Sequence, residues 1–199
     1  MSNKVTIKKT EILSEEKHKL KKITFQRLEE KGTSQEHINE VYDMGNAVTV
    51  LLYNAQQKTV ILTKQFRLPS YLNGNKTGML IEACAGKIEN ESPEESIKRE
   101  IEEETGYRVP VAKKIFEVYT SPGSITELLH FFVAEYNSSM KVNDGGGLKE
   151  EKEEIEVMEI PFAAAMQMIE TDKIKDAKTI MLLLYAKTHD IFNAQAAQE

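Results

Sequence analysis

Cysteine is nearly missing from this sequence: Cys84 is the only cysteine in 199 residues, so no disulfide can form within the chain. A single cysteine fits a reducing compartment, and Cys84 is most simply a small buried hydrophobic side chain. Long apolar runs are missing too. The longest, residues 180–186, falls far short of the roughly eighteen residues that a membrane helix needs, and no basic start with an apolar segment lies near Met1. We therefore expect a cytoplasmic protein that does not span a membrane.

The chain has fewer positive than negative side chains: Lys+Arg number 26 and Asp+Glu number 32, so the net charge is −6. No stripe of Lys and Arg with interleaved aromatic residues is present to follow a phosphate backbone, so we expect no nucleic-acid partner. The one basic cluster is most simply the solvated face of a strand. It comprises Lys17, Lys19, Lys21 and Lys22. The expected partners are therefore small molecules.

Two regions differ in the pattern of their apolar residues. Residues 5–27 alternate apolar and polar positions, which predicts two short strands, and a polar break follows at residues 29–39. From residue 40 onward short strands are dense, so we place a boundary near residues 40–45. The sequence thus predicts an N-terminal β-domain at residues 1–44 and a second domain at residues 45–199.

The second domain mixes strands with helices and contains no internal repeat. The expected strands from residue 40 onward are residues 41–44, at the boundary, and residues 47–53, 59–67, 79–86, 113–120, 128–136 and 155–160. The expected helices are residues 93–104, 162–171 and 178–193. Strands interleaved with a few helices predict a layered α/β fold.

The helix at residues 93–104 has clear start and stop signals. Ser92 can cap its first turn, Pro93 suits the first helical position, and Glu95 can complete a capping box. Gly106 can end the helix in the left-handed conformation.

Three glutamates share one face of this helix near its C-terminus: Glu100, Glu103 and Glu104. Ile97 and Ile101 share another face, which can pack on a sheet. Carboxylates are unfavourable at this end of a helix, and like charges one turn apart cost roughly 0.2–0.5 kcal/mol per pair. A solvated acidic face is the simpler explanation, and a divalent cation such as Mg²⁺ is the more specific one.

The segment REIEEETGY at residues 99–107 matches the end of the Nudix box, REUxEExGU, where U is a bulky apolar residue. Ala85 and Gly86 take the glycine start of that motif. Counting from Gly86 puts the mid-loop glutamate of the box at Ser92, whereas counting back from the arginine puts it at Glu91. With these residues the chain resembles the Nudix hydrolases.

Beyond the box, the resemblance covers nearly the whole chain and narrows to the GDP-mannose pyrophosphatase group. It rests on EVYDMGNAVTVLLYNAQQKTVILTKQFR, LNGNKTG, IEACAG, EVYTSPGSITELLHFFVAEY, GGGL, EEIEV and IKDAKT. The resemblance implies a Nudix α/β/α sandwich with a mixed β-sheet and a small N-terminal antiparallel β-domain that takes part in a homodimer. It also implies cleavage that depends on Mg²⁺, with Mn²⁺ as an alternative metal.

The activity that this resemblance implies first is hydrolysis of GDP-mannose to GMP and mannose 1-phosphate. ADP-ribose or another nucleoside diphosphate sugar is the alternative substrate. A catalytically silent Nudix-fold binding module is a third hypothesis, against which the intact set of glutamates argues.

The resemblance further implies roles for individual residues. The metal ligands would be the carbonyl of Ala85 and the carboxylates of Glu100, Glu103, Glu104 and Glu153. Substrate contacts would come from Lys17, Ile38, Asn39, Glu40, Arg67, Ala85, Gly86, Lys87, Glu104, Glu127 and Lys178. Arg99 would hold the loop and the glutamates in place. The N-terminal set departs from the family pattern, because Lys17 lacks the aromatic face on which a base stacks.

Catalysis also requires a general base, which we expect outside the helix on a loop that closes over the substrate. The loop NDGGGLKEEKEE at residues 143–154 fits, because its three glycines can serve as a hinge. Counting back from the following strand makes the base Glu153, whereas counting forward from the glycines makes it Glu151. We favour Glu153, because strand register is firmer than loop length. Glu103 would bind or orient a second ion.

Overall fold

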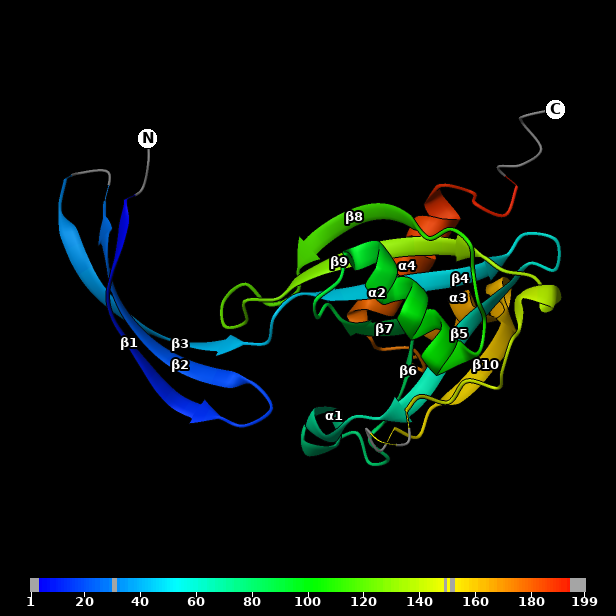
Figure 1. Cartoon of the computed structure of the whole chain (residues 1–199), viewed down its shortest axis with the longest axis horizontal. Coiled ribbons are helices and arrows are strands. Elements are labelled where there is room, and N and C mark those ends of the chain that lie inside the picture. The colour runs from blue at the N-terminus through cyan, green and yellow to red at the C-terminus, as the bar shows by residue number, and fades with distance from the viewer. Residues whose placement is uncertain (1–3, 30–31, 149, 151–152, 194–199) are drawn as a thin grey trace. The chain divides into compact units, whose positions relative to one another are not determined.

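The computed structural model describes residues 4–29, 32–148, 150 and 153–193 (Figure 1). The chain divides into two compact units. The N-terminal unit comprises Met1–Asn46 and Val118–Leu129, and the larger unit comprises Ala47–Glu117 and His130–Glu199. Within the described residues, no helix is both long enough and apolar enough to cross a bilayer.

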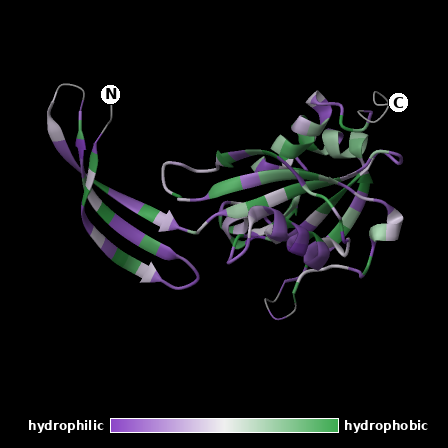
Figure 2. Cartoon of the chain, turned by 45° about the horizontal axis from the view of Figure 1, so that its top comes forward, coloured by the Kyte–Doolittle hydropathy of each residue, from purple (hydrophilic) through white to green (hydrophobic). Residues whose placement is uncertain are grey.

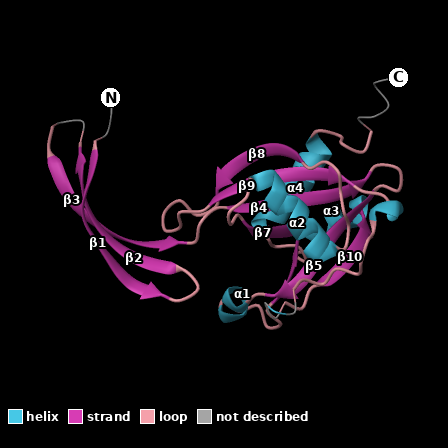
Figure 3. Ribbon diagram, in the orientation of Figure 1, coloured by secondary structure: helices cyan, strands magenta, loops and turns pink. Residues whose placement is uncertain are grey.

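The N-terminal unit is built on a three-stranded antiparallel sheet in the order β1-β2-β3 (Figure 3). The strands are β1 (Val5–Glu15), β2 (Lys19–Leu28) and β3 (Ser34–Asp43). The polar break expected at residues 29–39 is wrong, because β3 occupies most of it and pairs with β2 along its whole length. A polar segment can form a strand here because no residue of the three strands is buried.

The N-terminal sheet leaves apolar side chains exposed on its strands. In Figure 2 these strands show both hydrophilic (purple) and hydrophobic (green) residues. The large apolar side chains of this sheet with 44% to 58% exposure are Val5, Ile7, Ile12, Leu13, Leu28 and Ile38. A three-stranded sheet gains most of its stability from an apolar face that is covered. This sheet therefore lacks a core of its own.

The loop at residues 120–127 joins this sheet at the end of β3. Tyr42 and Ile125 form a bridge, in which the Tyr42 N–H donates to the Ser124 carbonyl at 2.8 Å and the Thr126 N–H donates to the Tyr42 carbonyl at 3.2 Å. The Thr126 hydroxyl also donates to Asp43 at 2.9 Å. These contacts explain why residues 118–129 group with the N-terminal strands, which the sequence did not indicate.

The larger unit contains a mixed seven-stranded sheet whose main path is β10-β5-β4-β9-β8. The strands are β4 (Ala47–Asn54), β5 (Thr59–Phe66), β6 (Met79–Glu82), β7 (Cys84–Lys87), β8 (Lys113–Tyr119), β9 (Leu128–Glu135) and β10 (Glu156–Pro161). The single strand expected at residues 79–86 is in fact two strands that separate at Ala83. The first, β6, pairs with β5, and the second, β7, pairs with β4, so the chain changes its partner strand at this point.

Helices cover both faces of this sheet, with α2 in front of it and α3 and α4 behind it in Figure 1. Their bounds are α1 (Leu68–Leu72), α2 (Pro93–Glu100), α3 (Phe162–Glu170) and α4 (Ala177–Thr188), with a short 3₁₀ turn, η2, at Ser138–Met140. The arrangement is the α/β/α sandwich that the sequence predicted.

The glutamate-rich helix begins as predicted and ends differently. Ser92 and Glu95 form the expected capping box, and Gly106 ends the segment with a φ of 78°. The chain is α-helical only to Glu100, however, and Ile101–Thr105 form a π-helical turn, η1. Such turns are most frequent at functional sites.

The core of the larger unit lies between α2 and the sheet. Ile97 and Ile101 are fully buried against Val48 and Ile61, as their spacing predicted. Each such side chain contributes about 1.5–3 kcal/mol through burial. Cys84 is 1% exposed in the same cluster, which confirms that it is a buried small side chain. Packing of α2 on the sheet thus fixes the helix that carries the glutamates.

Candidate active site

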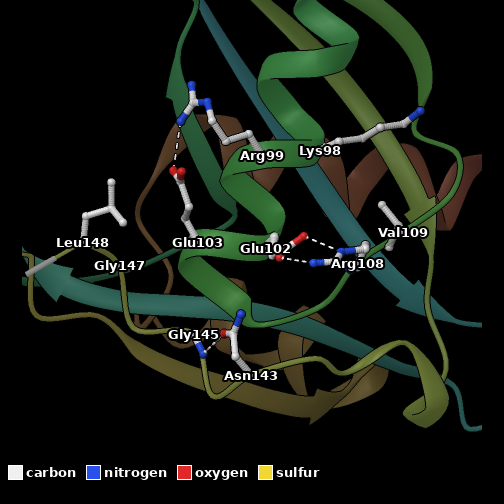
Figure 4. A pocket seen from close by; sticks show the side chains of 10 residues that line it. All are labelled: Lys98, Arg99, Glu102, Glu103, Arg108, Val109, Asn143, Gly145, Gly147 and Leu148. Atoms are coloured by element: carbon white, nitrogen blue, oxygen red, sulfur yellow. Dashed lines mark hydrogen bonds and ion pairs between the residues drawn. The ribbon is translucent and has the colours of Figure 1, made fainter.

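Arg99 is the centre of an ion-pair network around α2. Its Nε donates to Glu91 at 3.0 Å, and its Nη1 donates to Glu100 and to Glu103, each at 2.9 Å. Figure 4 shows the Arg99–Glu103 pair at the side of the helix. Of the two ways to count the mid-loop glutamate, the structure thus pairs Glu91 with the arginine and uses Ser92 as the helix cap. Arg99 ties the loop before α2 to the glutamates at its end.

Gly86 provides the space that Glu100 occupies. A β-carbon at Gly86 would overlap the carboxyl group of Glu100, so only glycine allows this side chain to lie against β7. Burial raises the pKa of Glu100 to about 7, although its ion pair with Arg99 acts in the opposite direction. The charges of Glu103 and Glu153 raise the pKa further.

Glu104 is the most deeply buried carboxylate of the group, with an exposure of 4%. Its Oε2 accepts the Ala85 N–H at 3.3 Å, which links the π-helical turn to β7. Burial raises the pKa of Glu104 to about 8, and the charges of Glu100 and Glu153 add to this effect. Hydrogen bonds from Cys84 and Ala85 lower the pKa without offsetting burial. Glu100, Glu104 and Glu153 therefore form a cluster of carboxylates that repel one another.

The three consecutive glycines cap the end of the glutamate helix. Gly146 N–H donates to the Glu104 carbonyl at 2.9 Å, and Gly147 N–H donates to the Glu103 carbonyl at 3.0 Å. Helix C-termini leave such carbonyls unpaired unless another segment reaches them. Residues 145–147 all have positive φ values, which suit glycine. In this structure the glycines are thus a cap, and their role as a hinge stays a prediction.

This cap also places Glu153 beside the other carboxylates. The Leu148 N–H donates to Glu153 Oε2 at 3.1 Å, and a β-carbon on Gly147 would lie 2.5 Å from the same oxygen. Glu153 affects the pKa values of both Glu100 and Glu104, so it lies within electrostatic range of them. The competing candidate, Glu151, lies outside the described residues.

A second polar network joins β5, β6 and α4. The Arg67 guanidinium donates to Glu82 through Nε and Nη2, and Lys178 lies 3.5 Å from the same carboxylate. Lys178 also lies 3.0 Å from Asp176, the cap of α4. The sequence indicated Arg67 and Lys178 but missed Glu82 and Asp176. Glu82 could have been identified from the sequence, because it is the single acidic residue in the otherwise apolar run MLIEACAG.

The other candidate substrate residues fall in the N-terminal unit, with one exception. Ile38, Asn39 and Glu40 lie on β3 opposite β2, and Lys17 is exposed in the turn between β1 and β2. Glu127 accepts a hydrogen bond from Thr120 at 2.9 Å in the same unit. The exception is Lys87, which is exposed at the end of β7, where its carbonyl faces Arg99 Nη2 at 3.5 Å.

A cavity of about 630 Å³ opens beside the C-terminal part of the glutamate helix (Figure 4). It is lined by Lys98, Arg99, Glu102, Glu103, Arg108, Val109, Asn143, Gly145, Gly147 and Leu148. In Figure 4, Glu102 and Arg108 face each other, with hydrogen bonds of 2.7 Å. The cavity shares Arg99 and Glu103 with the carboxylate network, whereas Glu100 and Glu104 are not in its lining. It is therefore distinct from the space around the buried carboxylates.

The buried carboxylates fit a divalent cation by their chemistry. Burying an anion is costly, and both raised pKa values reflect that cost, which the partners of Glu100 and Glu104 do not offset. Among the described residues, no group of three or more His, Cys, Asp or Glu side chains forms a ready metal cage. Magnesium needs no such cage, because it binds through one or two carboxylates together with waters and substrate phosphates. Glu100 and Glu104 can provide these carboxylates, and the Ala85 carbonyl stays a predicted ligand.

Known proteins resemble both parts of the chain. Residues 43–183 match the NUDIX domain, and residues 4–42 match the N-terminal domain of the GDP-mannose pyrophosphatase NudK. A GDP-mannose pyrophosphatase of Yersinia enterocolitica (serotype O:8, biotype 1B) is 52% identical over 191 residues, covering 96% of this chain and 99% of that protein. One of Escherichia coli (strain SMS-3-5) is 48% identical over 193 residues, covering 97% and 100%.

Similarity also extends to a solved structure. The crystal structure of an ADP compounds hydrolase matches with a TM-score of 0.71, over 98% of this chain and 97% of that one. Because the two sequences are only 16% identical, this likeness concerns the fold alone.

The raised carboxyl pKa values predict how stability depends on pH without metal. In the folded protein Glu100 and Glu104 have pKa values of about 7 and 8, above the ordinary 4.5, so the folded state keeps protons that the unfolded state releases. Their contribution to stability is therefore present below pH 4.5 and lost as the pH rises through 8. We expect the melting temperature in EDTA to fall by several degrees between pH 5 and pH 9, measured by circular dichroism.

Two variants check the source of this pH dependence. Glu104→Gln should reduce it, because the amide does not titrate and only Glu100 then keeps a raised pKa. Glu102→Gln should retain it, because the hydrogen bond from Arg108 lowers the pKa of Glu102 and moves its titration below pH 4.5. A wild-type melting temperature that stays constant or rises from pH 5 to 9 would contradict the assignment.

Proposed function

The chain belongs to the Nudix hydrolases, and from this premise we propose that it hydrolyses GDP-mannose to GMP and mannose 1-phosphate in the presence of Mg²⁺. One observation carries the proposal: Glu100 and Glu104 lie within electrostatic range of each other in a chain that is 52% identical to a GDP-mannose pyrophosphatase over nearly its whole length. The resemblance of residues 4–42 to the N-terminal domain of such enzymes supports the same substrate.

The residues of the larger unit divide the work as follows. Glu100, Glu104 and the Ala85 carbonyl would hold the cation, and Glu103 would orient a second one. A divalent cation bound there supplies charge neutralisation and polarises the phosphoryl oxygens. Arg99 keeps the glutamates in place through its ion pairs at 2.9 Å.

Proton transfer and phosphate binding fall to residues beyond the helix. Glu153, beside the other carboxylates, accepts the proton of the attacking water. Arg67 and Lys178 contact the diphosphate or sugar, and an arginine edge suits two parallel contacts to one phosphate. Gly86 and Lys87 are further candidate contacts to the substrate. Glu127 binds sugar hydroxyls or assists the metal.

Base recognition is assigned to the N-terminal unit, through Lys17, Ile38, Asn39 and Glu40. Because Lys17 cannot stack on a base, ADP-ribose or another nucleoside diphosphate sugar is the second candidate substrate. We also propose that the enzyme works in the cytoplasm and binds no nucleic acid, which its net charge of −6 and single cysteine support.

A hydrolysis panel tests this function. Purified protein should cleave GDP-mannose with Mg²⁺ faster than ADP-ribose, ADP-glucose or UDP-glucose, as measured by product chromatography. Mn²⁺ should replace Mg²⁺, and EDTA should abolish turnover. Glu100→Gln and Glu104→Gln should each nearly abolish turnover with the fold intact, because each removes a metal charge and little volume. A near-normal rate in either variant would refute the metal assignment, and faster cleavage of ADP-ribose would identify the second substrate instead.

The assignment of the base makes a separate prediction. Glu153→Gln should lower kcat by roughly 10²–10⁴ with little change in KM, which is the range for losing a positioned proton acceptor. Glu151→Gln should have a much smaller effect and serves as the matched control in the same loop. The opposite ranking of the two variants, measured by steady-state kinetics, would assign the base to Glu151.

The exposed apolar side chains of the N-terminal sheet support a homodimer. The sheet has no buried residue, and a sheet of this size needs a surface that covers its apolar side chains. We propose that a second copy of the chain provides this surface and that each N-terminal unit contributes to the site of its partner.

Sedimentation checks this assembly. We expect a dimer at micromolar concentration, and we expect Ile7→Glu, which places a charge at a side chain that is 57% exposed, to shift it toward monomer. Thr6→Glu is the control, because neighbouring strand residues point to opposite faces. A wild-type protein that sediments as a monomer would rule the dimer out.

A further inference from the structure

Glu82 is a buried carboxylate that the proposed chemistry does not use. It ends β6 with an exposure of 3%, yet it has no role as a metal ligand or proton acceptor above. The guanidinium of Arg67 donates to it from Nε at 3.1 Å and from Nη2 at 2.7 Å. Lys178 Nζ lies 3.5 Å from Oε2, and Gln65 Nε2 donates to the same oxygen at 3.5 Å. One buried anion thus holds two cations.

The elements that carry this network are fixed relative to one another. Glu82 pairs with Thr63 in the β5–β6 register, and the side chains of Gln65 and Arg67, two and four residues further along the chain, both reach its carboxylate. Asp176 caps α4 by accepting the Thr179 N–H at 3.0 Å, and the Thr179 hydroxyl accepts the Ala83 N–H at 2.6 Å. The first turn of α4 is therefore tied to the point where β6 ends, and Glu82 has little freedom to move.

The network is electrostatically connected to the carboxylate cluster. Burial lowers the pKa of Arg67, but its hydrogen bond to Glu82 and the charges of Glu82, Glu104 and Asp176 raise it overall. Arg67 thus lies within range of Glu104. The Arg67 side chain is 41% exposed, whereas the Glu82 side chain is 4% exposed. The guanidinium therefore reaches solvent, and the carboxylate that holds it does not. Glu82 engages the Nε–Nη2 edge, and within the described part of the chain Nη1 makes no hydrogen bond, so this amino group is available to an external acceptor.

We propose that Glu82 is a positioning residue: it fixes Arg67 and Lys178 so that both cations face the diphosphate of the substrate. This inference rests on the proposed function, because it concerns the same site. Arginine and lysine side chains each have many rotamers, and two neighbouring cations repel each other without a shared anion. Holding them before the substrate binds avoids the entropic cost of ordering them during the reaction. Oriented donors also stabilise the charge that develops on the leaving phosphate.

Kinetics on three variants separate positioning from stability. Glu82→Gln keeps the shape of the side chain and removes its charge, and we expect kcat/KM to fall about 10–100-fold. Most of this loss should disappear in an Arg67→Ala background, where Glu82→Gln should cost less than about threefold, because only Lys178, which Asp176 also holds, is then left to position. Equal losses in both backgrounds would assign Glu82 a structural role only, and an unchanged rate would exclude any role.

A matched control comes from another ion pair that joins β5 to a neighbouring strand. Glu156 lies 2.8 Å from Lys64 across β5 and β10, but this glutamate is 58% exposed and far less constrained. Glu156→Gln should leave kcat/KM within about twofold of wild type. If circular dichroism shows that Glu82→Gln does not fold, Glu82→Asp replaces it in the kcat/KM comparison between the two backgrounds. This variant keeps the charge and shortens the side chain.

A spectroscopic measurement makes the inference independent of activity. The Arg67 Nε–H signal, assigned by its loss in Arg67→Ala, should be protected from exchange in wild type and in Glu156→Gln, and should lose this protection in Glu82→Gln. A protected signal in Glu82→Gln would overturn the inference. If the wild type hydrolyses no nucleotide sugar, the proposed function fails, while this signal still decides whether Glu82 holds Arg67.

Discussion

The repulsion among the carboxylates of Glu100, Glu104 and Glu153 is the constraint on which the rest of the site depends. Burial opposes the charges of Glu100 and Glu104 and raises the pKa values of both groups. Three features of the chain bring these carboxylates together. Gly86 leaves room for Glu100, Arg99 pairs with it, and the glycine loop caps the helix while placing Glu153. The stability lost at this point is what a cation would recover on binding.

Two buried acid centres lie close together in the larger unit and differ in how their charge is compensated. Glu104 has the Ala85 N–H and Cys84 as its hydrogen-bond partners and keeps a high pKa. Glu82, equally buried, is neutralised by Arg67 and Lys178. The first centre is thus incomplete without a ligand, and the second is complete within the protein. This contrast separates the place where a metal would bind from the place where the cations that meet the substrate are anchored.

Several features could be predicted from local sequence because their causes are local. The capping box at Ser92, the left-handed Gly106 and the burial of Ile97 and Ile101 follow from spacing within one helix, and the structure agrees with all of them. Features that depend on distant partners were missed. Strand β3 forms from polar residues because β2 lies beside it, and β6 and β7 separate at Ala83 because they pair with different strands. The π-helical turn after Glu100 was missed because its cause is the surroundings of the helix end.

The sequence by itself determined the layered α/β fold, the glutamate helix and its likeness to the Nudix box, because these features follow from residue spacing and residue type. It also named most of the candidate residues, including Arg67, Lys178 and Glu153. Only the tertiary structure decided that Glu91, one residue before the helix cap, is the partner of Arg99, and that Glu82 is the shared anchor of two cations. Such pairings depend on side chains that approach from separate strands and helices, and burial then affects their charge. Neither the pairing nor the burial can be predicted from a local pattern in the chain.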